Sequence, residues 1–157
     1  MDRAALHPVF AECADAAIAA LHAASASHDR AGLEAFVATG ADGTPTMQID
    51  ALVEAAILEA ARRHRVNVLS EEVGFIDVGS SLTLVVDPLD GSANAAAGVP
   101  LSCFSAALAQ DDVFFQASTV RLETGRAGPA RSPVGSWLAR PSDRRPGPAH
   151  LLSGLDS

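Results

Sequence analysis

The chain has no lysine, so all 11 of its basic residues are arginines, and 19 Asp and Glu residues give it a formal net charge of −8. A nucleic-acid partner requires a basic surface that meets the phosphates, and this charge balance argues against one. An acidic protein can still bind an anionic substrate when cations bridge the two. Any anionic ligand of this chain therefore calls for a bound metal.

Cysteines and long apolar runs are also scarce. Cys13 and Cys103 stand alone, outside any paired metal or redox spacing, which favours small buried side chains over a disulfide. The apolar segment at residues 6–21 contains Glu12 and Asp15, which argues against a membrane span, and nothing resembles a secretory signal. We expect a cytoplasmic protein with no membrane partner.

The 157 residues, 48% of them hydrophobic, suit one domain with a substantial core. Apolar spacing predicts a helix from about residue 6 to 25–28 with Asp2 as its cap, a short helix at 30–38 and a long helix through 52–60. Strands are expected at 66–69 and 82–86, then a short helix at 92–97 and a hairpin of strands 104–109 and 113–116. This order predicts an α+β fold with two long helices on a mostly antiparallel sheet.

The last 38 residues differ in composition from the rest. Residues 1–119 carry 5 Arg and 16 acids, a net of −11, whereas residues 120–157 carry 6 Arg and 3 acids, a net of +3. The second segment also holds 5 of the 9 prolines, and only the run VGSWLA is typical of a buried piece. We expect a domain at 1–119 and an irregular Arg- and Pro-rich tail at 120–157.

The stretch LVVDPLDGSANAAAG, residues 84–98, leads an apolar strand into Asp87 and Asp90. It is either a solvated turn or a cation site. An EF-hand loop is excluded because positions 89, 91 and 98 hold Leu, Gly and Gly, and the D-x-D phosphatase spacing does not match. Two aspartates on a tight turn, with the Leu89 carbonyl between them, supply oxygens that Mg²⁺ prefers.

Other acids lie at comparable places in the sequence. Glu71 and Glu72 follow the strand at 66–69, and Asp50 lies near the start of the long helix. Taken alone, Asp50 or Glu72 is more typical of a solvated surface. If the two strands are neighbours, however, Glu71 joins Asp87 and Asp90 in one divalent-cation site.

Three ordered segments, GADGTPTMQID, SEEVG and VVDPLDGSANAAAGVP, resemble the inositol monophosphatase family over residues 38–110, and most of all its archaeal members that also act on fructose 1,6-bisphosphate. The resemblance implies the N-terminal half of a layered α/β sugar-phosphatase fold. It also implies Mg²⁺-dependent hydrolysis of a phosphorylated sugar or polyol, two or three Mg²⁺ ions, and a homodimer as a common assembly.

The resemblance assigns roles position by position. The metal ligands it implies are Glu71, Asp87, the Leu89 carbonyl and Asp90, with Asp42 and Thr44 near a third, mobile metal. Asp50 and Ser92, the latter where the family usually has threonine, would polarise the attacking water, with Glu71 completing the catalytic set. The backbone N–H groups of Gly91 and Ser92 would bind the substrate phosphate.

The chain also departs from the family pattern. The second half is missing, and Trp137 is followed by Leu and Ala instead of the acid of a W-D-x-A motif. Two alternatives stay open: an inactive fragment that binds metal or phosphate without turnover, and an interaction module whose acids only solvate its surface. We expect low or no activity from this chain alone, with a shifted reading frame or a natural truncation behind residues 120–157.

Overall fold

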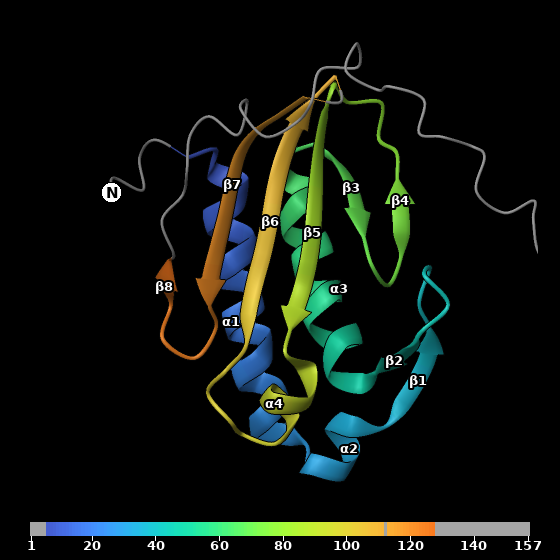
Figure 1. Ribbon diagram of the computed structural model, residues 1–157, viewed down its shortest axis with the longest axis vertical. Helices are drawn as coiled ribbons and strands as arrows, with labels where there is room; N and C mark the ends of the chain where they lie inside the picture. Colours follow the sequence, from blue (N-terminus) through green and yellow to red (C-terminus); the bar gives the residue numbers. More distant parts are fainter. Residues whose placement is uncertain (1–5, 112, 128–157) are drawn as a thin grey trace, which may run out of the picture.

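The fold is an α+β arrangement of two long helices on a six-stranded sheet, seen in a computed structural model that describes residues 6–111 and 113–127 (Figure 1). The elements follow the order α1 (Pro8–Ser27), α2 (Arg30–Glu34), β1 (Phe36–Thr39), β2 (Pro45–Met47), α3 (Gln48–Arg63), β3 (Asn67–Ser70), β4 (Gly74–Ile76), β5 (Leu82–Asp90), α4 (Ser92–Ala96), β6 (Cys103–Gln110), β7 (Val113–Arg121) and β8 (Arg126–Ala127).

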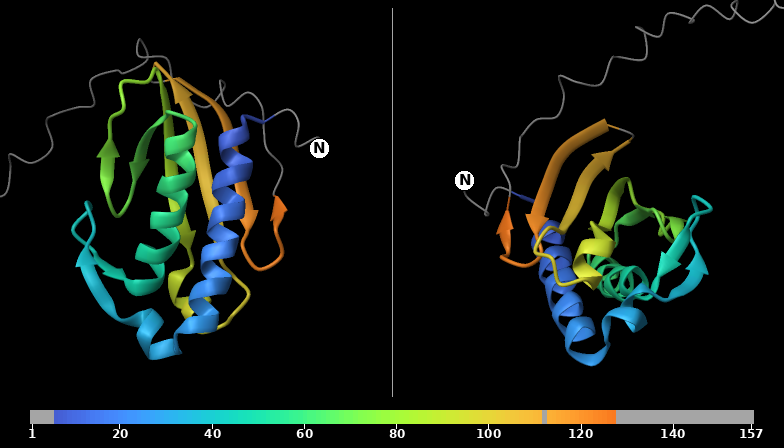
Figure 2. Two further views of the ribbon diagram at one scale, coloured as in Figure 1. Left: turned by 180° about the vertical axis from the view of Figure 1, so that it is seen from behind. Right: turned by 60° about the horizontal axis from the view of Figure 1, so that its bottom comes forward.

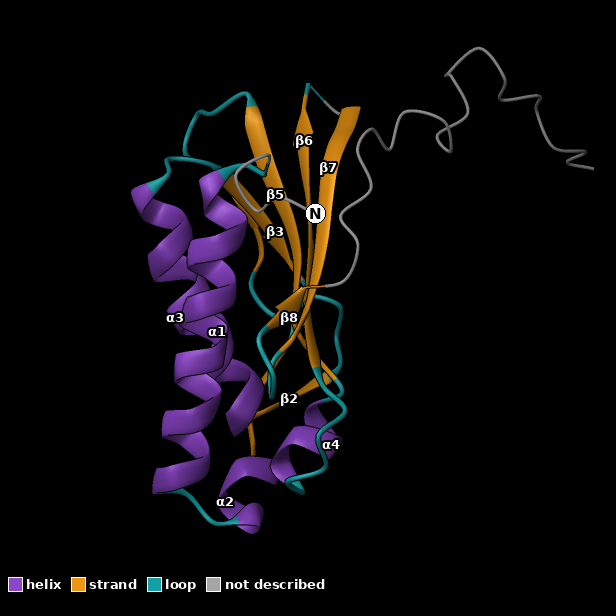
Figure 3. Ribbon diagram, turned by 90° about the vertical axis from the view of Figure 1, so that its left-hand side faces the viewer, coloured by secondary structure: helices purple, strands orange, loops and turns teal. Residues whose placement is uncertain are grey.

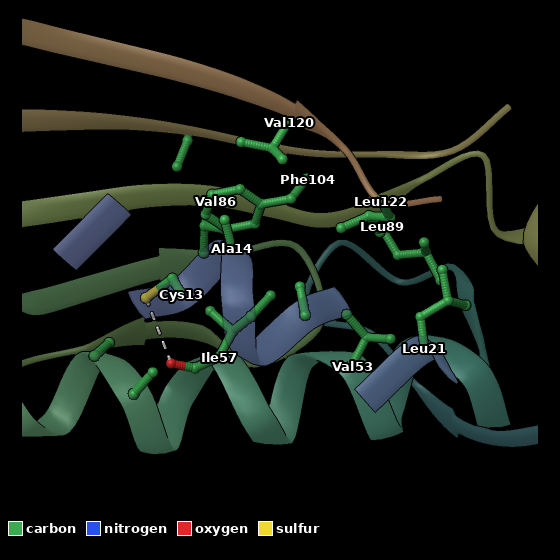
Figure 4. Packing of buried hydrophobic residues seen from close by; sticks show 14 of the residues in the cluster. Cys13, Ala14, Leu21, Val53, Ile57, Val86, Leu89, Phe104, Val120 and Leu122 are labelled. Atoms are coloured by element: carbon green, nitrogen blue, oxygen red, sulfur yellow. Dashed lines mark hydrogen bonds between the residues drawn. The ribbon is translucent and has the colours of Figure 1, made fainter. Parts of the chain in front are cut away.

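The long helices α1 and α3 lie side by side on one face of the sheet (Figures 2 and 3). Their apolar residues recur at helical spacing and meet the inward side chains of β5 and β6 in one buried core. Figure 4 shows this contact, in which Cys13 and Ile57 of the two helices face Phe104 of the sheet. The expectation of two long helices packed on a sheet is confirmed.

Helix α1 begins one residue after His7, whose Nδ1 accepts a hydrogen bond from the Val9 N–H at 3.2 Å. The expected cap Asp2 lies outside the described residues.

By length and hydropathy, α1 is the one described helix that could span a membrane, although core helices of soluble proteins pass the same test. Glu12 and Asp15 therefore do not by themselves exclude a membrane span for α1. Seven of its residues are buried in the core.

The sheet has the strand order β4-β3-β5-β6-β7-β8, with β3 parallel to β5 and every other pair antiparallel. Ser70 at the end of β3 pairs with Val86 in β5. Because parallel strands run the same way, the segments that follow Ser70 and Val86 emerge at one edge, beside α4 and the start of α3 (Figure 1). The topology thus brings together the acids that follow both strands.

Several boundaries differ from the predicted ones. Strand β5 continues through Asp87 and Asp90 with a register irregularity between them, so the aspartates lie within a bulged strand and not on a tight turn after it. The predicted helix at 30–38 ends at Glu34, and β1 then pairs with β2 in a separate hairpin. Strands β4 and β8 were not predicted, because three and two residues are too short to show a period.

The domain extends past the expected boundary at residue 119. Strand β7 runs through to Arg121, and Val120 and Leu122 are buried in the core at 3% and 0% exposure. Alternate residues at the end of β7, Ser118 and Val120, are buried on either side of residue 119, so the change in composition does not mark the end of the fold. Residues 128–157, with the run VGSWLA, lie outside the described residues.

The opposite face of the sheet carries exposed apolar side chains. Leu69 and Phe75 pair across β3 and β4 and are 43% and 58% exposed, and α1 and α3 both lie on the other face (Figure 3). Within the described chain, the sheet face that carries Leu69 and Phe75 has the apolar character of a surface that a second layer would cover.

Of the two cysteines, Cys13 is buried as expected, whereas Cys103 is only half-buried.

Candidate active site

A cavity of about 180 Å³ lies at the edge of the sheet where the segments after β3 and within β5 emerge. Four elements contribute to it: the β1–β2 hairpin, the start of α3, the β3–β4 turn and the β5–α4 segment. Its lining residues are Thr44, Pro45, Met47, Asp50, Glu71, Glu72, Asp87, Pro88, Leu89 and Ser92. Six of the nine predicted site residues therefore share one cavity.

Asp50 and Ser92 are in direct contact within this cavity. Asp50 lies in the first turn of α3, where its Oδ2 accepts from the Met47 N–H at 3.3 Å, as an acid at a helix start does. Its Oδ1 accepts a hydrogen bond from the Ser92 hydroxyl, which also lies 2.9 Å from the Leu89 carbonyl oxygen. Burial raises the pKa of Asp50 above its ordinary value, and the bond from Ser92 opposes that rise.

Gly91 fixes the place of Ser92. It has a φ of 90° and precedes α4, whose first residue is Ser92. A Cβ at this position would lie 2.6 Å from the Leu101 carbonyl oxygen, so no larger residue fits without a shift of the backbone. The glycine of the D-P-L-D-G-S motif is therefore required by both the backbone conformation and the close approach of a neighbouring chain segment.

The β3–β4 turn carries Glu71 and Glu72 to the other side of the cavity. Thr46 of β2 donates its hydroxyl to Glu72 Oε2, and the Ala41 N–H donates to the Glu72 carbonyl at 2.9 Å. Glu72 therefore belongs to the site, although the sequence favoured a solvated side chain. Its neighbour Glu71 is the acid that the motif predicted. The adjacency of the two glutamates in the sequence does not indicate that both side chains line the cavity.

Asp42 and Thr44 lie in the loop of the β1–β2 hairpin. The backbone N–H and the hydroxyl of Thr44 both donate to Asp42 Oδ1, at 2.8 and 2.7 Å, and these bonds hold the pKa of Asp42 below its ordinary value. Thr44 lines the cavity, whereas Asp42 lies in the exposed loop beside it. Asp42 and Thr44, both predicted site residues, thus form hydrogen bonds with each other at the rim of the cavity.

Asp90 lines a second cavity, although its charge still acts on Asp87. It is exposed and opens onto a different cavity, of about 350 Å³, where the Cys103 thiol lies 3.5 Å from its Oδ2. In the sheet register Asp87 pairs with Ser105 and Asp90 with Cys103, which places the aspartates two positions apart along β6. Glu71 and Asp87 thus line one cavity and Asp90 opens onto another, and a metal site shared by the three acids stays a prediction. Among residues 6–111 and 113–127, no group of three or more His, Cys, Asp or Glu is spaced to hold a metal.

The charges around the cavity nevertheless act on one another. Burial raises the pKa of Glu71, and repulsion from Asp87, Asp42, Glu72 and Asp50 raises it further, in that order. Burial and the charge of Asp90 likewise raise the pKa of Asp87. Among the described residues, no basic side chain lines the cavity to offset this repulsion. A donor set of carboxylates, hydroxyls and a backbone carbonyl fits a hard divalent cation.

Together, the two layers of helices and sheet and the acidic cavity define an α+β protein with an oxygen-lined site at the edge of its sheet. The profile of the inositol monophosphatase family matches residues 6–120, and the chain belongs to this family. This confirms the resemblance carried by the three sequence segments.

Individual relatives agree with this placement. The chain is 49% identical over 69 residues to a fructose-1,6-bisphosphatase/inositol-1-monophosphatase of Thermococcus kodakarensis, a match that covers 44% of this chain and 27% of that protein. It is 41% identical over 91 residues to a fructose-1,6-bisphosphatase of Pyrococcus furiosus, covering 55% and 36%.

A solved structure has the same fold. A hypothetical protein from Pyrococcus horikoshii, with similarities for inositol-1 monophosphatase, superimposes with a TM-score of 0.63 at 26% identity. The match covers 76% of this chain and 45% of that one. The chain thus spans less than half of the length of the relatives it matches.

Proposed function

We propose that this chain carries the catalytic cavity of a Mg²⁺-dependent phosphatase that hydrolyses a phosphate monoester of a sugar or polyol, with inositol monophosphate and fructose 1,6-bisphosphate as the candidate substrates. The single observation that carries the proposal is the hydrogen-bonded pair of Asp50 and Ser92 in the same cavity as Glu71 and Asp87. The family membership and the names of the relatives support it.

In this proposal, two or three Mg²⁺ ions bind among the oxygen donors of the site. Their ligands are drawn from Glu71, Asp87, the Leu89 carbonyl and Asp90, with Asp42 and Thr44 beside a third ion. When bound, Mg²⁺ offsets the charge of the phosphate and makes a water molecule acidic enough to act as the nucleophile. The repulsion among the carboxylates supports a cation at this place.

The residues of the chain then orient the attacking water. The Ser92 hydroxyl has one proton and two neighbouring acceptors, Asp50 and the Leu89 carbonyl, so its oxygen lone pairs stay available to accept from a water molecule. Asp50 draws the hydroxyl proton toward itself and strengthens Ser92 as that acceptor. The raised pKa of the Asp50 carboxyl also makes it a better proton acceptor than an exposed aspartate.

The proposed phosphate contacts are the backbone N–H groups of Gly91 and Ser92. Ser92 is the first residue of α4, so its N–H has no acceptor within that helix. We further propose a cytoplasmic protein that acts on small molecules, with neither nucleic acid nor a membrane as a partner, and that assembles as a homodimer.

The alternative is a chain that binds metal or phosphate without turnover. Two observations favour it: the relatives are more than twice as long as the matched region, and Leu69 and Phe75 are exposed on the uncovered face of the sheet. Substrate contacts supplied by a second layer would be missing from such a chain.

Phosphate release by the purified chain separates the two candidates. Each substrate is incubated with Mg²⁺, with EDTA, and with Mg²⁺ and the Ser92→Ala variant. Release that requires Mg²⁺ and is lost in Ser92→Ala supports the phosphatase. No release, together with saturable Mg²⁺ binding, supports the alternative, and release that is unaffected by EDTA contradicts both.

A further inference from the structure

A buried carboxylate beneath the cavity has no part in the proposed chemistry. Glu54 lies on α3, is 4% exposed and does not line the cavity. Within the described residues it has no ion-pair partner. A buried carboxylate that no cation neutralises costs stability relative to an apolar side chain of similar size, and burial raises the pKa of Glu54 accordingly. The fold keeps a side chain here that packing alone does not explain.

The hydrogen bonds of Glu54 flank the two glutamates of the site. Its Oε1 accepts from the Ser70 hydroxyl and from the Val73 N–H, the latter at 3.4 Å. Ser70 is the last residue of β3, and Val73 is the last residue before β4. Glu71 and Glu72 are the two residues between these anchors. One carboxylate oxygen thus ties down both ends of the segment that carries them.

The same helix reaches both sides of the cavity. Asp50 and Glu54 are four residues apart, so they lie on one face of α3 one turn from each other. Asp50 contacts Ser92 at the start of α4, and Glu54 contacts the β3–β4 turn. Since a helix is rigid over one turn, α3 sets the separation between the water-orienting residues and the glutamates.

We propose that Glu54 is a positioning residue, which holds the β3–β4 turn so that Glu71 and Glu72 point into the cavity and thereby sets the affinity of the site for divalent cations. This inference rests on the proposed function. Glu54 acts as a hydrogen-bond acceptor and does not touch the metal or the substrate. Residues that orient metal ligands in this way typically change metal affinity by about 10–100-fold when they are removed.

Three variants of the chain separate positioning from general stability. Glu54→Ala removes the acceptor, whereas Glu54→Gln keeps an oxygen at the same place and should keep both hydrogen bonds. Ser70→Ala removes one of the two donors and is the milder change if Glu54→Ala does not fold. Glu59→Ala is the matched control on the same helix, because Glu59 is exposed and forms an ion pair with Arg62 on the surface of α3.

Two measurements are made on each variant: amide hydrogen exchange of residues 71–74 in metal-free buffer, and Mg²⁺ binding by calorimetric titration. We expect faster exchange confined to this turn in Glu54→Ala, with Mg²⁺ affinity about 10–100-fold weaker, a smaller loss in Ser70→Ala, and near wild-type behaviour in Glu54→Gln and Glu59→Ala. Unchanged exchange at the turn, faster exchange spread evenly over the chain, or unchanged Mg²⁺ affinity in Glu54→Ala would each overturn the inference.

The two proposals fail in different ways. If the wild-type chain binds no Mg²⁺, the proposed function is contradicted, and the exchange of the turn still decides whether Glu54 holds it. If the wild-type chain binds Mg²⁺ and Glu54→Ala binds it equally well, the positioning role is wrong and the metal site stands.

Discussion

The Ser92 hydroxyl donates a hydrogen bond to Asp50, a residue 42 positions earlier in the chain. The contact joins the first residue of α4 to the first turn of α3, across the cavity edge where β5 ends. It combines a buried carboxylate with a hydroxyl whose lone pairs are free for water. The predictions below follow from this pair and from the acids around it.

Asp50→Asn should abolish phosphate release by a chain that is otherwise active, because the amide keeps the shape of the side chain and removes the charge that polarises Ser92. Loss of at least about 100-fold in turnover is expected for a general-base role. Asp111→Asn is the control, since Asp111 lies on the turn between β6 and β7 with a φ of 49° that asparagine adopts readily. Turnover that survives in Asp50→Asn would remove this residue from the mechanism.

Asp87→Asn should make the metal-free chain more stable, because burial and the neighbouring acids disfavour the charge of Asp87 in the folded state. A gain of about 1 kcal/mol corresponds to a rise in melting temperature of about 2–4 °C for a chain of this size. The same variant should lose the stabilisation that Mg²⁺ gives the wild-type chain. Thermal denaturation in EDTA and in Mg²⁺ measures both effects, and a metal-free variant that melts below the wild type would count against the repulsion.

Gly91→Ala and Gly43→Ala form a matched pair, since their φ values are 90° and 89°. A Cβ at Gly43 meets nothing within 4 Å, so only the backbone conformation is penalised, by about 1–2 kcal/mol. At Gly91 the Leu101 carbonyl must also move, which adds about 1–3 kcal/mol. Urea denaturation of both variants should rank Gly91→Ala as the less stable one, and equal stabilities would mean that the close contact is absent.

Cys13 should resist thiol reagents in the folded chain at pH 8, because burial raises its pKa to about 12, whereas the half-buried Cys103 should react first. The unfolded chain ionises Cys13 from about pH 8.5 upward, so the folded state retains the proton and stability should fall as the pH rises past this value. Cys13→Ala should reduce that fall. Two thiols reacting equally fast in the native chain would contradict the buried position.

The sequence predicted the site best where the signal was local. Apolar runs that end in acids located β3 and β5, and their parallel pairing then placed Glu71 and Asp87 on one cavity. The bulge between Asp87 and Asp90, which turns Asp90 to a second cavity, could not be predicted because it leaves no trace in hydrophobic spacing. Glu54 was missed because one acid on an amphipathic helix is normally solvated, and only its four-residue distance from Asp50 indicated a shared face.

Calorimetric titration of the metal-free chain with Mg²⁺ tests the central claim most directly, because a divalent cation between Glu71 and Asp87 is common to the active and the inactive interpretation. The account predicts saturable binding that is abolished in Asp87→Asn and Glu71→Gln and preserved in Asp111→Asn. Absence of saturable binding in the wild-type chain, or binding that is equal in Asp87→Asn, would contradict it.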